Sequence, residues 1–198
     1  MRNELRKRLK SARVGIAGAG GLGSNCAVAL ARAGVGHLVV ADFDVVQRSN
    51  LDRQYYFLDQ IGKHKTEALR ENIARIDPDI RVDAKALRLD AGNVAVAFAG
   101  CSVVVEALDD AAAKAMLIEA ALAISPETLV VAASGIAGWG RVEELGVRRM
   151  GRLFLVGDLE SAVSDELPPM ASRVGVAACM EADLVLEILL GGSSPKGA

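Results

Sequence analysis

The chain has 198 residues, a formal net charge of −2 and 52% hydrophobic residues. This length predicts a single domain over residues 1–198, because domains hold roughly 100 to 200 residues. The near balance of 23 basic and 25 acidic residues leaves no broad positive field for nucleic acid. The longest uncharged stretch, residues 14–31, contains five glycines and is a poor membrane span. We therefore expect neither nucleic acid nor a membrane as a partner.

The cysteine spacing points to a reducing compartment. Cys26, Cys101 and Cys179 are odd in number and far apart, so they predict neither a disulfide framework nor a zinc knuckle. The first ten residues mix both charges and lack the apolar core of a secretion signal. A cytoplasmic location without zinc is expected. Cys26 and Cys179 are predicted to lie in the core, and no cysteine is expected to have a covalent role.

Short apolar runs alternate with helical patterns along the chain. The predicted strands are residues 14–18, 37–42, 80–86, 101–107 and 128–133, then an antiparallel strand at 141–149 with a partner at 152–156. The predicted helices are residues 22–33, 63–75, 93–99, 108–123 and 172–190. Residues 161–169 are predicted to form a mobile loop, and residues 193–198 to be disordered. The alternation predicts an α/β fold with a doubly wound, Rossmann-like, mostly parallel sheet and antiparallel strands toward the C-terminus.

A glycine-rich segment lies between the first predicted strand and the first predicted helix. Residues 18–24 read Gly-Ala-Gly-Gly-Leu-Gly-Ser, which contains the Gly-x-Gly-x-x-Gly spacing. Glycines let the backbone approach phosphate, and the N-terminus of the following helix favours an anion. Asp42, at the tip of the second strand, is placed to accept hydrogen bonds from ribose hydroxyls. The pair predicts a nucleotide site but leaves NAD, FAD and ATP open, and the plain alternative is a tight turn.

Four short motifs within residues 18–65 resemble the ThiF, MoeB and ubiquitin-activating-enzyme superfamily. They are the glycine loop, Asp-Phe-Asp at 42–44, Ser-Asn-Leu-Asp-Arg-Gln at 49–54 and Gly-Lys-His-Lys at 62–65, in the order and spacing of that family. The similarity extends from about residue 13 to residue 190. Longer relatives carry two Cys-x-x-Cys pairs for zinc, which this chain lacks. It is therefore most similar to the short ThiF-like proteins associated with thiamin thiazole synthesis.

The resemblance implies an activity, because enzymes of this superfamily adenylate the C-terminal glycine of a small ubiquitin-like carrier protein. It implies an ATP-dependent adenylyltransferase acting on a ThiS-like sulfur carrier that ends in Gly-Gly, with ATP and Mg²⁺ as cofactors and a homodimer as the assembly. At ~4 Å, the attacking carboxylate and an anionic phosphate repel by about 4 kcal/mol at an effective dielectric near 20. Fixed cations are therefore needed. No general base is needed, because the carboxylate is already ionised.

The resemblance also implies roles for individual residues. Arg53 and Lys65 would contact the phosphates, supported by Asn50 and Gln54, while Asp44 orders the loop. Asp109, after the fourth strand, would bind Mg²⁺ and completes the expected catalytic set. The residues implied in nucleotide binding are Gly18, Gly20, Gly21, Gly23, Ser24, Asp42, Asp44, Asn50, Arg53, Gln54 and Lys65. The plain alternatives are a solvated loop arginine at 53 and an exposed helix lysine at 65. Asp110 stands where the family has Asn; we expect it to cap the next helix, and metal binding by Asp110 is the less favoured alternative.

Several alternatives remain open at this point. The substrate could be a molybdopterin carrier or a modified tRNA base, although the pI of about 5.8 argues against tRNA. An NAD-dependent oxidoreductase would need its own acid or base, and no histidine or tyrosine constellation suggests one. A catalytically silent scaffold is the last alternative. The family's N-terminal arginine motif, which reaches the neighbouring subunit, is absent, leaving Arg2, Arg6 and Arg8 as candidates or as a solvated basic helix face.

Overall fold

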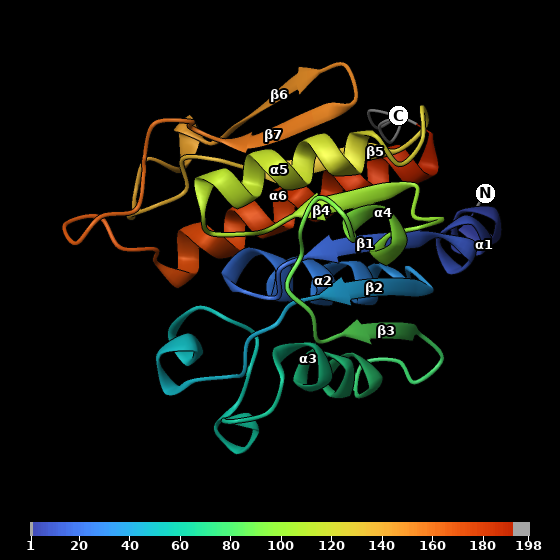
Figure 1. The fold of residues 1–198 in the computed structure, drawn as a ribbon, viewed down its shortest axis with the longest axis horizontal. Coiled ribbons are helices and arrows are strands. Elements are labelled where there is room, and N and C mark those ends of the chain that lie inside the picture. The colour runs from blue at the N-terminus through green and yellow to red at the C-terminus, as the bar shows by residue number, and fades with distance from the viewer. Residues whose placement is uncertain (1, 192–198) are drawn as a thin grey trace.

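The structure is a computed structural model that describes residues 2–191. Its strands are β1 (Arg13–Ala17), β2 (His37–Ala41), β3 (Arg81–Lys85), β4 (Val103–Glu106), β5 (Leu129–Ala133), β6 (Gly146–Met150) and β7 (Leu153–Gly157). They form a seven-stranded sheet in the order β3-β2-β1-β4-β5-β7-β6 (Figure 1). Every neighbouring pair is parallel except β6 and β7. The predicted mostly parallel sheet with antiparallel strands near its C-terminal end is confirmed, and the disorder predicted for 193–198 lies outside the described residues.

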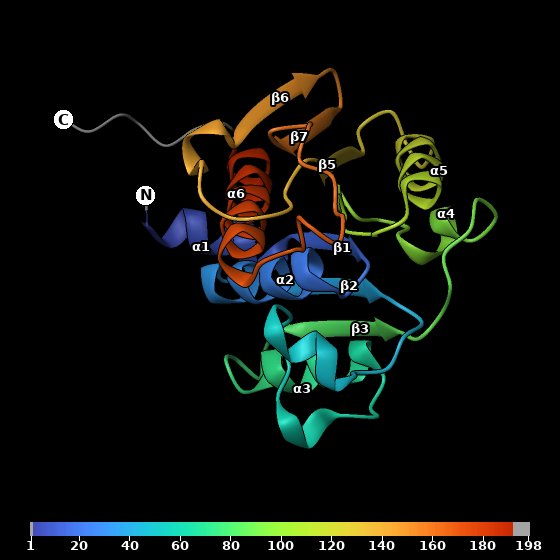
Figure 2. The ribbon, with the colours of Figure 1, turned by 90° about the vertical axis from the view of Figure 1, so that its left-hand side faces the viewer.

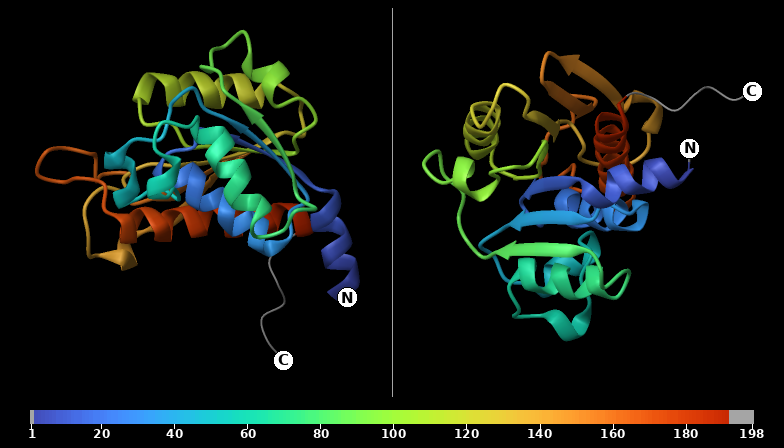
Figure 3. Two further views of the ribbon diagram at one scale, coloured as in Figure 1. Left: turned by 90° about the horizontal axis from the view of Figure 1, so that it is seen from below. Right: turned by 90° about the vertical axis from the view of Figure 1, so that its right-hand side faces the viewer.

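Helices cover both faces of the sheet, as a doubly wound fold requires. The helices are α1 (Arg2–Ser11), α2 (Gly21–Ala33), α3 (Lys65–Ala74), α4 (Val94–Ala97), α5 (Ala111–Leu122) and α6 (Ala171–Leu190). Figure 2 shows α2 and α6 on one face and α4 and α5 on the other. The buried side chains of α3 join the core of α2 and α6, whereas those of α4 and α5 form a second core. In Figure 3, α1 lies beside the C-terminal end of α6.

Alternation along the buried strands divides their side chains between these two cores. In β1, Val14 and Ile16 pack toward α2 and α6, while Ala17 faces the opposite core. Gly15 leaves room for a neighbour from α4, because a Cβ there would lie 2.6 Å from the Phe98 ring. The absence of a side chain at Gly15 thus lets a large aromatic ring pack directly against the backbone of β1.

Three features differ from the sequence-based predictions. Residues 2–11 form a helix, which the sequence pattern suggested only as a possible basic face and not among the predicted elements. The strand predicted at 141–149 is shorter, because Val142–Glu144 form a 3₁₀ turn and β6 begins only at Gly146. Cys179, predicted to be in the core, is exposed on the outward side of α6. Within residues 2–191, the helices are too short or too polar for any of them to cross a membrane.

Candidate nucleotide site

The predicted site residues gather at the carboxyl ends of three adjacent strands. The glycine loop follows β1, Asp42 follows β2, and Asp109 follows β4 by three positions. In the strand order, β2 and β3 lie on one side of β1, whereas β4 lies next to β1 on the other side. The direction in which successive strands are added therefore reverses between β1 and β4. Open α/β sheets bind ligands in the crevice at such a point. The fold therefore places these residues where a ligand site is expected.

The glycines of the loop have two different roles. Gly18 has a φ of +96°, and a Cβ there would lie 2.5 Å from the carbonyl oxygen of Ala107. A Cβ on Gly23 would collide with the carbonyl oxygen of Gly18. A Cβ on Gly20, in contrast, would meet only Gln54 Nε2, at 3.9 Å, and Gly20 precedes α2 without offering a side-chain cap. Gly18 and Gly23 thus allow close packing of the backbone, while Gly20 leaves the first turn of α2 open to an anion.

Asp42 joins the end of β2 to the glycine loop. Its Oδ2 accepts a hydrogen bond of 2.7 Å from the backbone N–H of Ala19, and its Oδ1 accepts one of 2.8 Å from the N–H of Asp44. An ionised carboxylate offers about four acceptor positions, so these two bonds leave room for further donors. Asp42 can therefore hold the loop and still accept hydrogen bonds from a ribose.

Three side chains tie the segment after β2 to the glycine loop, and we call them the brace: Ser24, Asn25 and Tyr56. Asn25 Nδ2 donates to the carbonyl oxygens of Gly21 at 2.7 Å and Arg53 at 3.0 Å. The Tyr56 hydroxyl, which is buried, donates to the carbonyl oxygen of Ala19 at 2.7 Å. Asn25 and Tyr56 were missed by the sequence analysis. A tyrosine next to the motif was the available signal, because a buried hydroxyl needs a partner.

Ser24 joins the glycine loop to the segment after β2 in the protein interior. Its hydroxyl donates to the carbonyl oxygen of Gly20 at 2.6 Å and accepts the N–H of Tyr55 at 3.0 Å. The side chain is fully buried. The Ser24 hydroxyl is thus engaged within the fold, and it fixes the loop and the following segment relative to each other.

Arg53 and Gln54 border the glycine loop. Arg53 Cγ and Cδ lie 3.7 and 3.8 Å from the position of a Cβ on Gly21, and Gln54 Nε2 lies 3.9 Å from that of a Cβ on Gly20. The Arg53 side chain is 27% exposed, and its Nη1 is 2.7 Å from Asp52 Oδ1. Gln54 Oε1 is buried without a hydrogen-bond partner. A partly exposed guanidinium and an unsatisfied amide oxygen beside an uncapped helix end suit a polar, anionic ligand.

Asn50 lies in the same segment but uses its side chain locally. It belongs to the 3₁₀ helix η1 (Arg48–Asp52), and its Oδ1 accepts the N–H of Gln47 at 2.9 Å. The backbone N–H of Arg53 in turn donates to the carbonyl oxygen of Asn50. Asn50 thus shapes the turn that carries Arg53.

Lys65, at the start of α3, is a buried cation. It is 6% exposed, and its Nζ lies 2.8 Å from Oδ2 of Asp44, whose side chain is 47% exposed. The backbone N–H of Lys65 also donates to the carbonyl oxygen of Asp44 at 2.9 Å. The plain alternative of an exposed helix lysine is wrong. The pair joins the two ends of the loop between β2 and α3, and it holds a positive charge beside Asp44, whose backbone N–H donates to Asp42.

Asp109 is exposed in the turn between β4 and α5. Asp110 caps α5, with its Oδ2 accepting the N–H of Ala113 at 2.8 Å, as predicted. Within residues 2–191, no group of three or more His, Cys, Asp or Glu side chains is placed to hold a metal by itself. Mg²⁺ in nucleotide sites takes one or two carboxylates and completes its shell with phosphates and water. An exposed carboxylate on a turn that touches Gly18 fits that donor set.

The start of α6 closes the site from the other side. Val174 Cγ1 lies 3.0 Å from the position of a Cβ on Gly21. The neighbouring Arg173 is buried, with Nη2 2.6 Å from Asp158 Oδ2 and Nη1 donating to the carbonyl oxygen of Gly140 at 2.6 Å. Burial tends to raise the pKa of Asp158, but hydrogen bonds from Ser161 and the charge of Arg173 lower it to about 2. This pair anchors α6 beside the glycine loop.

Two of the three cysteines, Cys26 and Cys101, are buried, and Cys179 is exposed. Burial raises the pKa of Cys26 well above its ordinary value, with the nearby Glu181 adding to the effect. Burial also raises the pKa of Cys101 to about 11. Since the thiolate is the nucleophile, these shifts favour the less reactive, protonated form of both thiols at neutral pH.

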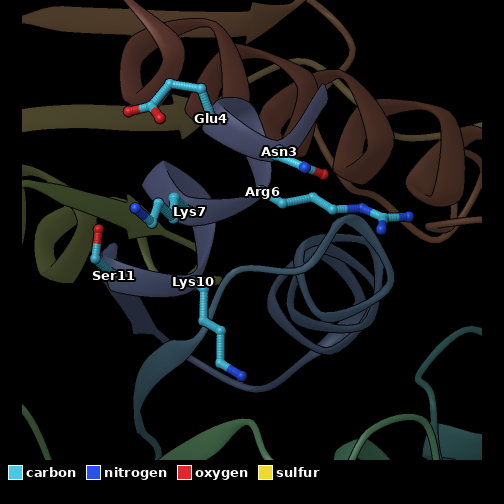
Figure 4. Close-up of a pocket in the computed structure, with 6 residues that line it drawn as sticks. All are labelled: Asn3, Glu4, Arg6, Lys7, Lys10 and Ser11. Atoms are coloured by element: carbon cyan, nitrogen blue, oxygen red, sulfur yellow. The ribbon is translucent and has the colours of Figure 1, made fainter. Parts of the chain in front are cut away.

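A separate pocket lies along α1, away from these residues. It is lined by Asn3, Glu4, Arg6, Lys7, Lys10 and Ser11 (Figure 4). Because α1 leads into the amino end of β1, this pocket lies at the opposite edge of the sheet from the glycine loop. Figure 4 shows the labelled side chains pointing in different directions, with Arg6 extending to the right and Lys10 extending downward. The pocket is therefore not part of the candidate site.

The chain is similar to several known proteins, in sequence to two named enzymes and in fold to a solved structure. A SAMP-activating enzyme E1 from Haloferax volcanii is 45% identical over 104 residues, which are 52% of this chain and 38% of that protein. A molybdopterin-synthase adenylyltransferase from Salmonella typhimurium is 33% identical over 185 residues, which are 90% of this chain and 74% of that protein. The structure of the E. coli tRNA N6-threonylcarbamoyladenosine dehydratase TcdA in complex with AMP matches with a TM-score of 0.84 at 23% identity, covering 95% of this chain and 89% of that one.

The matches cover different shares of the relatives, whereas the family comparison covers nearly all of this chain. The chain spans less than two fifths of the H. volcanii protein, but most of the S. typhimurium one. The ThiF family matches residues 1–197, which is nearly the whole chain. The motifs that suggested this family are the same ones that the fold brings together at the ends of β1 and β2. The chain belongs to the ThiF family.

Proposed function

We propose that the protein is an ATP-dependent adenylyltransferase that activates the C-terminal glycine carboxylate of a ThiS-like, ubiquitin-fold sulfur carrier. The observation that carries this proposal is an uncapped glycine loop bordered by Arg53, with the buried Lys65 paired to Asp44 in the segment that Asp42 joins to the loop. A nicotinamide dehydrogenase has no need of fixed cations there, whereas an attack on a triphosphate does. A homodimer in a reducing cytoplasm is part of the same proposal.

The names of the relatives support the reaction class. The S. typhimurium relative is a molybdopterin-synthase adenylyltransferase, and the H. volcanii relative is a SAMP-activating enzyme. The E. coli structure holds AMP. The choice of a ThiS-like carrier rests on the resemblance to short ThiF-like proteins and on the absence of Cys-x-x-Cys pairs from the sequence.

The proposed reaction is a single displacement at phosphorus. An oxygen of the carrier's terminal carboxylate forms a bond to the α-phosphorus of ATP, and the bond to the bridging oxygen of pyrophosphate breaks. The glycine loop and the first turn of α2 would bind the phosphates, with Arg53 and Lys65 compensating the charge that accumulates. Asp42 would hold the ribose. Asp109 would hold Mg²⁺, which would neutralise charge on the phosphates. The products are an acyl-adenylate and pyrophosphate.

The proposal is tested by the exchange of labelled pyrophosphate into ATP. Exchange should require Mg²⁺ and a purified ThiS-type carrier with its free terminal glycine. The variant Arg53→Ala should lower the exchange rate by ~100-fold or more, the usual effect of losing one contact to transition-state charge. Arg48→Ala is the matched control, because Arg48 lies exposed at the start of the 3₁₀ helix that Arg53 follows. It should leave the rate within about twofold of the wild type.

Parallel reactions distinguish the alternatives. A MoaD-type carrier or total tRNA replaces the ThiS-type carrier in two further arms, and NADH binding is measured separately. Exchange that needs a MoaD-type carrier or tRNA instead would overturn the choice of substrate. Tight NADH binding without ATP binding would overturn the whole proposal.

A further inference from the structure

The turn that carries Asp109 is held by two charged side chains that the mechanism above does not use. The N–H of Leu108 donates to Glu106 Oε1 at 2.7 Å, and the carbonyl oxygen of Leu108 accepts from Lys114 Nζ at 3.1 Å. Lys114 Nζ also lies 2.7 Å from Glu106 Oε2. Both backbone polar groups of Leu108 are thus bonded to side chains that pair with each other. This closed ring fixes the residue directly before Asp109.

The ring is an expensive arrangement for packing alone. Glu106 is the last residue of β4 and is fully buried, while the Lys114 side chain is 20% exposed. The preceding residues of β4 are all valine, and apolar side chains could fill this space as well. A buried ion pair is often no more stabilising than apolar residues of the same volume. Its effect here is to set the direction of a turn, because hydrogen bonds are directional and apolar contacts are not.

Asp109 is held on its other side as well. Asp110 accepts the N–H of Ala113 and begins α5. Ala107, between Glu106 and Leu108, contacts the end of β1. Its N–H donates to the carbonyl oxygen of Ala17, and its carbonyl oxygen lies against Gly18. The turn 107–110 is therefore connected to the glycine loop at one end and to α5 at the other. Asp109 is the exposed carboxylate between these two fixed points.

We propose that Glu106 and Lys114 are positioning residues that hold Asp109 in the orientation needed to bind a nucleotide-bound divalent cation. This inference rests on the proposed function. Glu106 itself is not a ligand, because it is fully buried, with Oε1 accepting from Leu108 and Oε2 lying 2.7 Å from Lys114 Nζ. Groups that orient a ligand commonly change metal affinity 10- to 100-fold when they are removed. The ring acts through Asp109, so its loss should weaken cation binding and leave the nucleotide contacts in place.

The test uses Mn²⁺ as the probe, since it can replace Mg²⁺ and its binding is followed by electron paramagnetic resonance. Free Mn²⁺ is titrated into the 198-residue protein in the presence of saturating ATP, without any carrier. This readout does not need the adenylation reaction, so it separates the two proposals. Asp109→Asn sets the size of the full effect. ATP binding in the presence of EDTA is measured in parallel for each variant.

Lys114→Met and Glu106→Gln should each weaken Mn²⁺ binding to the protein–ATP complex by ~10-fold, in the direction of Asp109→Asn. Metal-free ATP binding should stay within about twofold of the wild type. Lys114→Arg, which keeps the charge and the donors, should recover most of the Mn²⁺ affinity. Glu119→Gln, an exposed change in the same helix, is the control and should have no effect.

Two results would overturn the inference. One is wild-type Mn²⁺ affinity in folded Lys114→Met or Glu106→Gln when Asp109→Asn binds the ion weakly. The other is an equal loss of metal-free ATP binding, which would indicate general damage to the site. If Lys114→Met does not fold, the comparison of Lys114→Arg with Glu106→Gln decides, because the first keeps the ring and the second breaks its ion pair. A lack of carrier-dependent exchange in the wild type would overturn the proposed function alone.

Discussion

Replacing Lys65 by methionine separates its charge from its packing. The side chain is 6% exposed, so a methionine of similar length can fill the same space. Lys65 Nζ and Asp44 Oδ2 are 2.8 Å apart, which corresponds to a Coulomb attraction of about 6 kcal/mol at an effective dielectric of 20. The cost of burying the ammonium offsets most of that attraction. Asp44, nearly half exposed, remains hydrated after the change. The free energy of unfolding should therefore change by no more than about 1 kcal/mol.

Activity should respond very differently from stability. If Lys65 compensates charge on the phosphates, Lys65→Met removes one transition-state contact and lowers pyrophosphate exchange by ~100-fold or more, about 2.7 kcal/mol. Lys63→Met is the control, because Lys63 is exposed and pairs with Glu71 on the surface of α3. Its exchange rate should lie within about twofold of the wild type. A folded Lys65→Met protein that keeps more than a third of the wild-type exchange rate would refute the role given to this cation.

Three further predictions concern stability and are measured by urea denaturation. Arg173→Met leaves Asp158 buried without its cation and should lower the free energy of unfolding by ~3–5 kcal/mol, and a loss below about 1 kcal/mol would contradict the anchoring role. Because hydrogen bonds and Arg173 lower the pKa of Asp158 to about 2 despite its burial, the carboxylate stabilises the fold above about pH 4. Asp158→Asn should therefore be less stable than the wild type at pH 6, and this difference should shrink as the pH falls toward 2. Burial, aided by the charge of Glu106, raises the pKa of Glu181 well above its ordinary value, so the folded state loses stability as the pH rises above about 4.3. Glu181→Met should stabilise the protein, and by more at pH 8 than at pH 5; an equal effect at both values would contradict a neutral buried acid.

The strands and helices that were predicted well are those with long apolar runs. Residues 103–105 and 130–132 are buried on both faces of the sheet, so their pattern alone identifies central strands. The segment 141–150 was harder, because every residue of β6 is exposed and its pairing with β7 decides its structure. Cys179 was misplaced because α6 is apolar on more than its buried side, and composition does not tell which side faces the core.

The candidate site shows the same division between local and tertiary information. The glycine loop and Asp42 are adjacent to strand ends, so the sequence places them correctly relative to the sheet. Asn25 and Tyr56 act through contacts with residues far along the chain, and no local pattern reveals those partners. The burial of Lys65 was likewise not predictable, since it depends on how α3 packs against the loop that precedes it.

The brace has a consequence for local opening of the molecule. Tyr56 and Asn25 bond the loop after β2 to the turn after β1, so residues 48–56 cannot swing outward unless the turn at 19–21 is released too. Segments joined in this way open as one cooperative unit. Their amide protons should therefore be replaced by deuterium at a common rate, and a ligand that touches only the turn would slow the replacement in both.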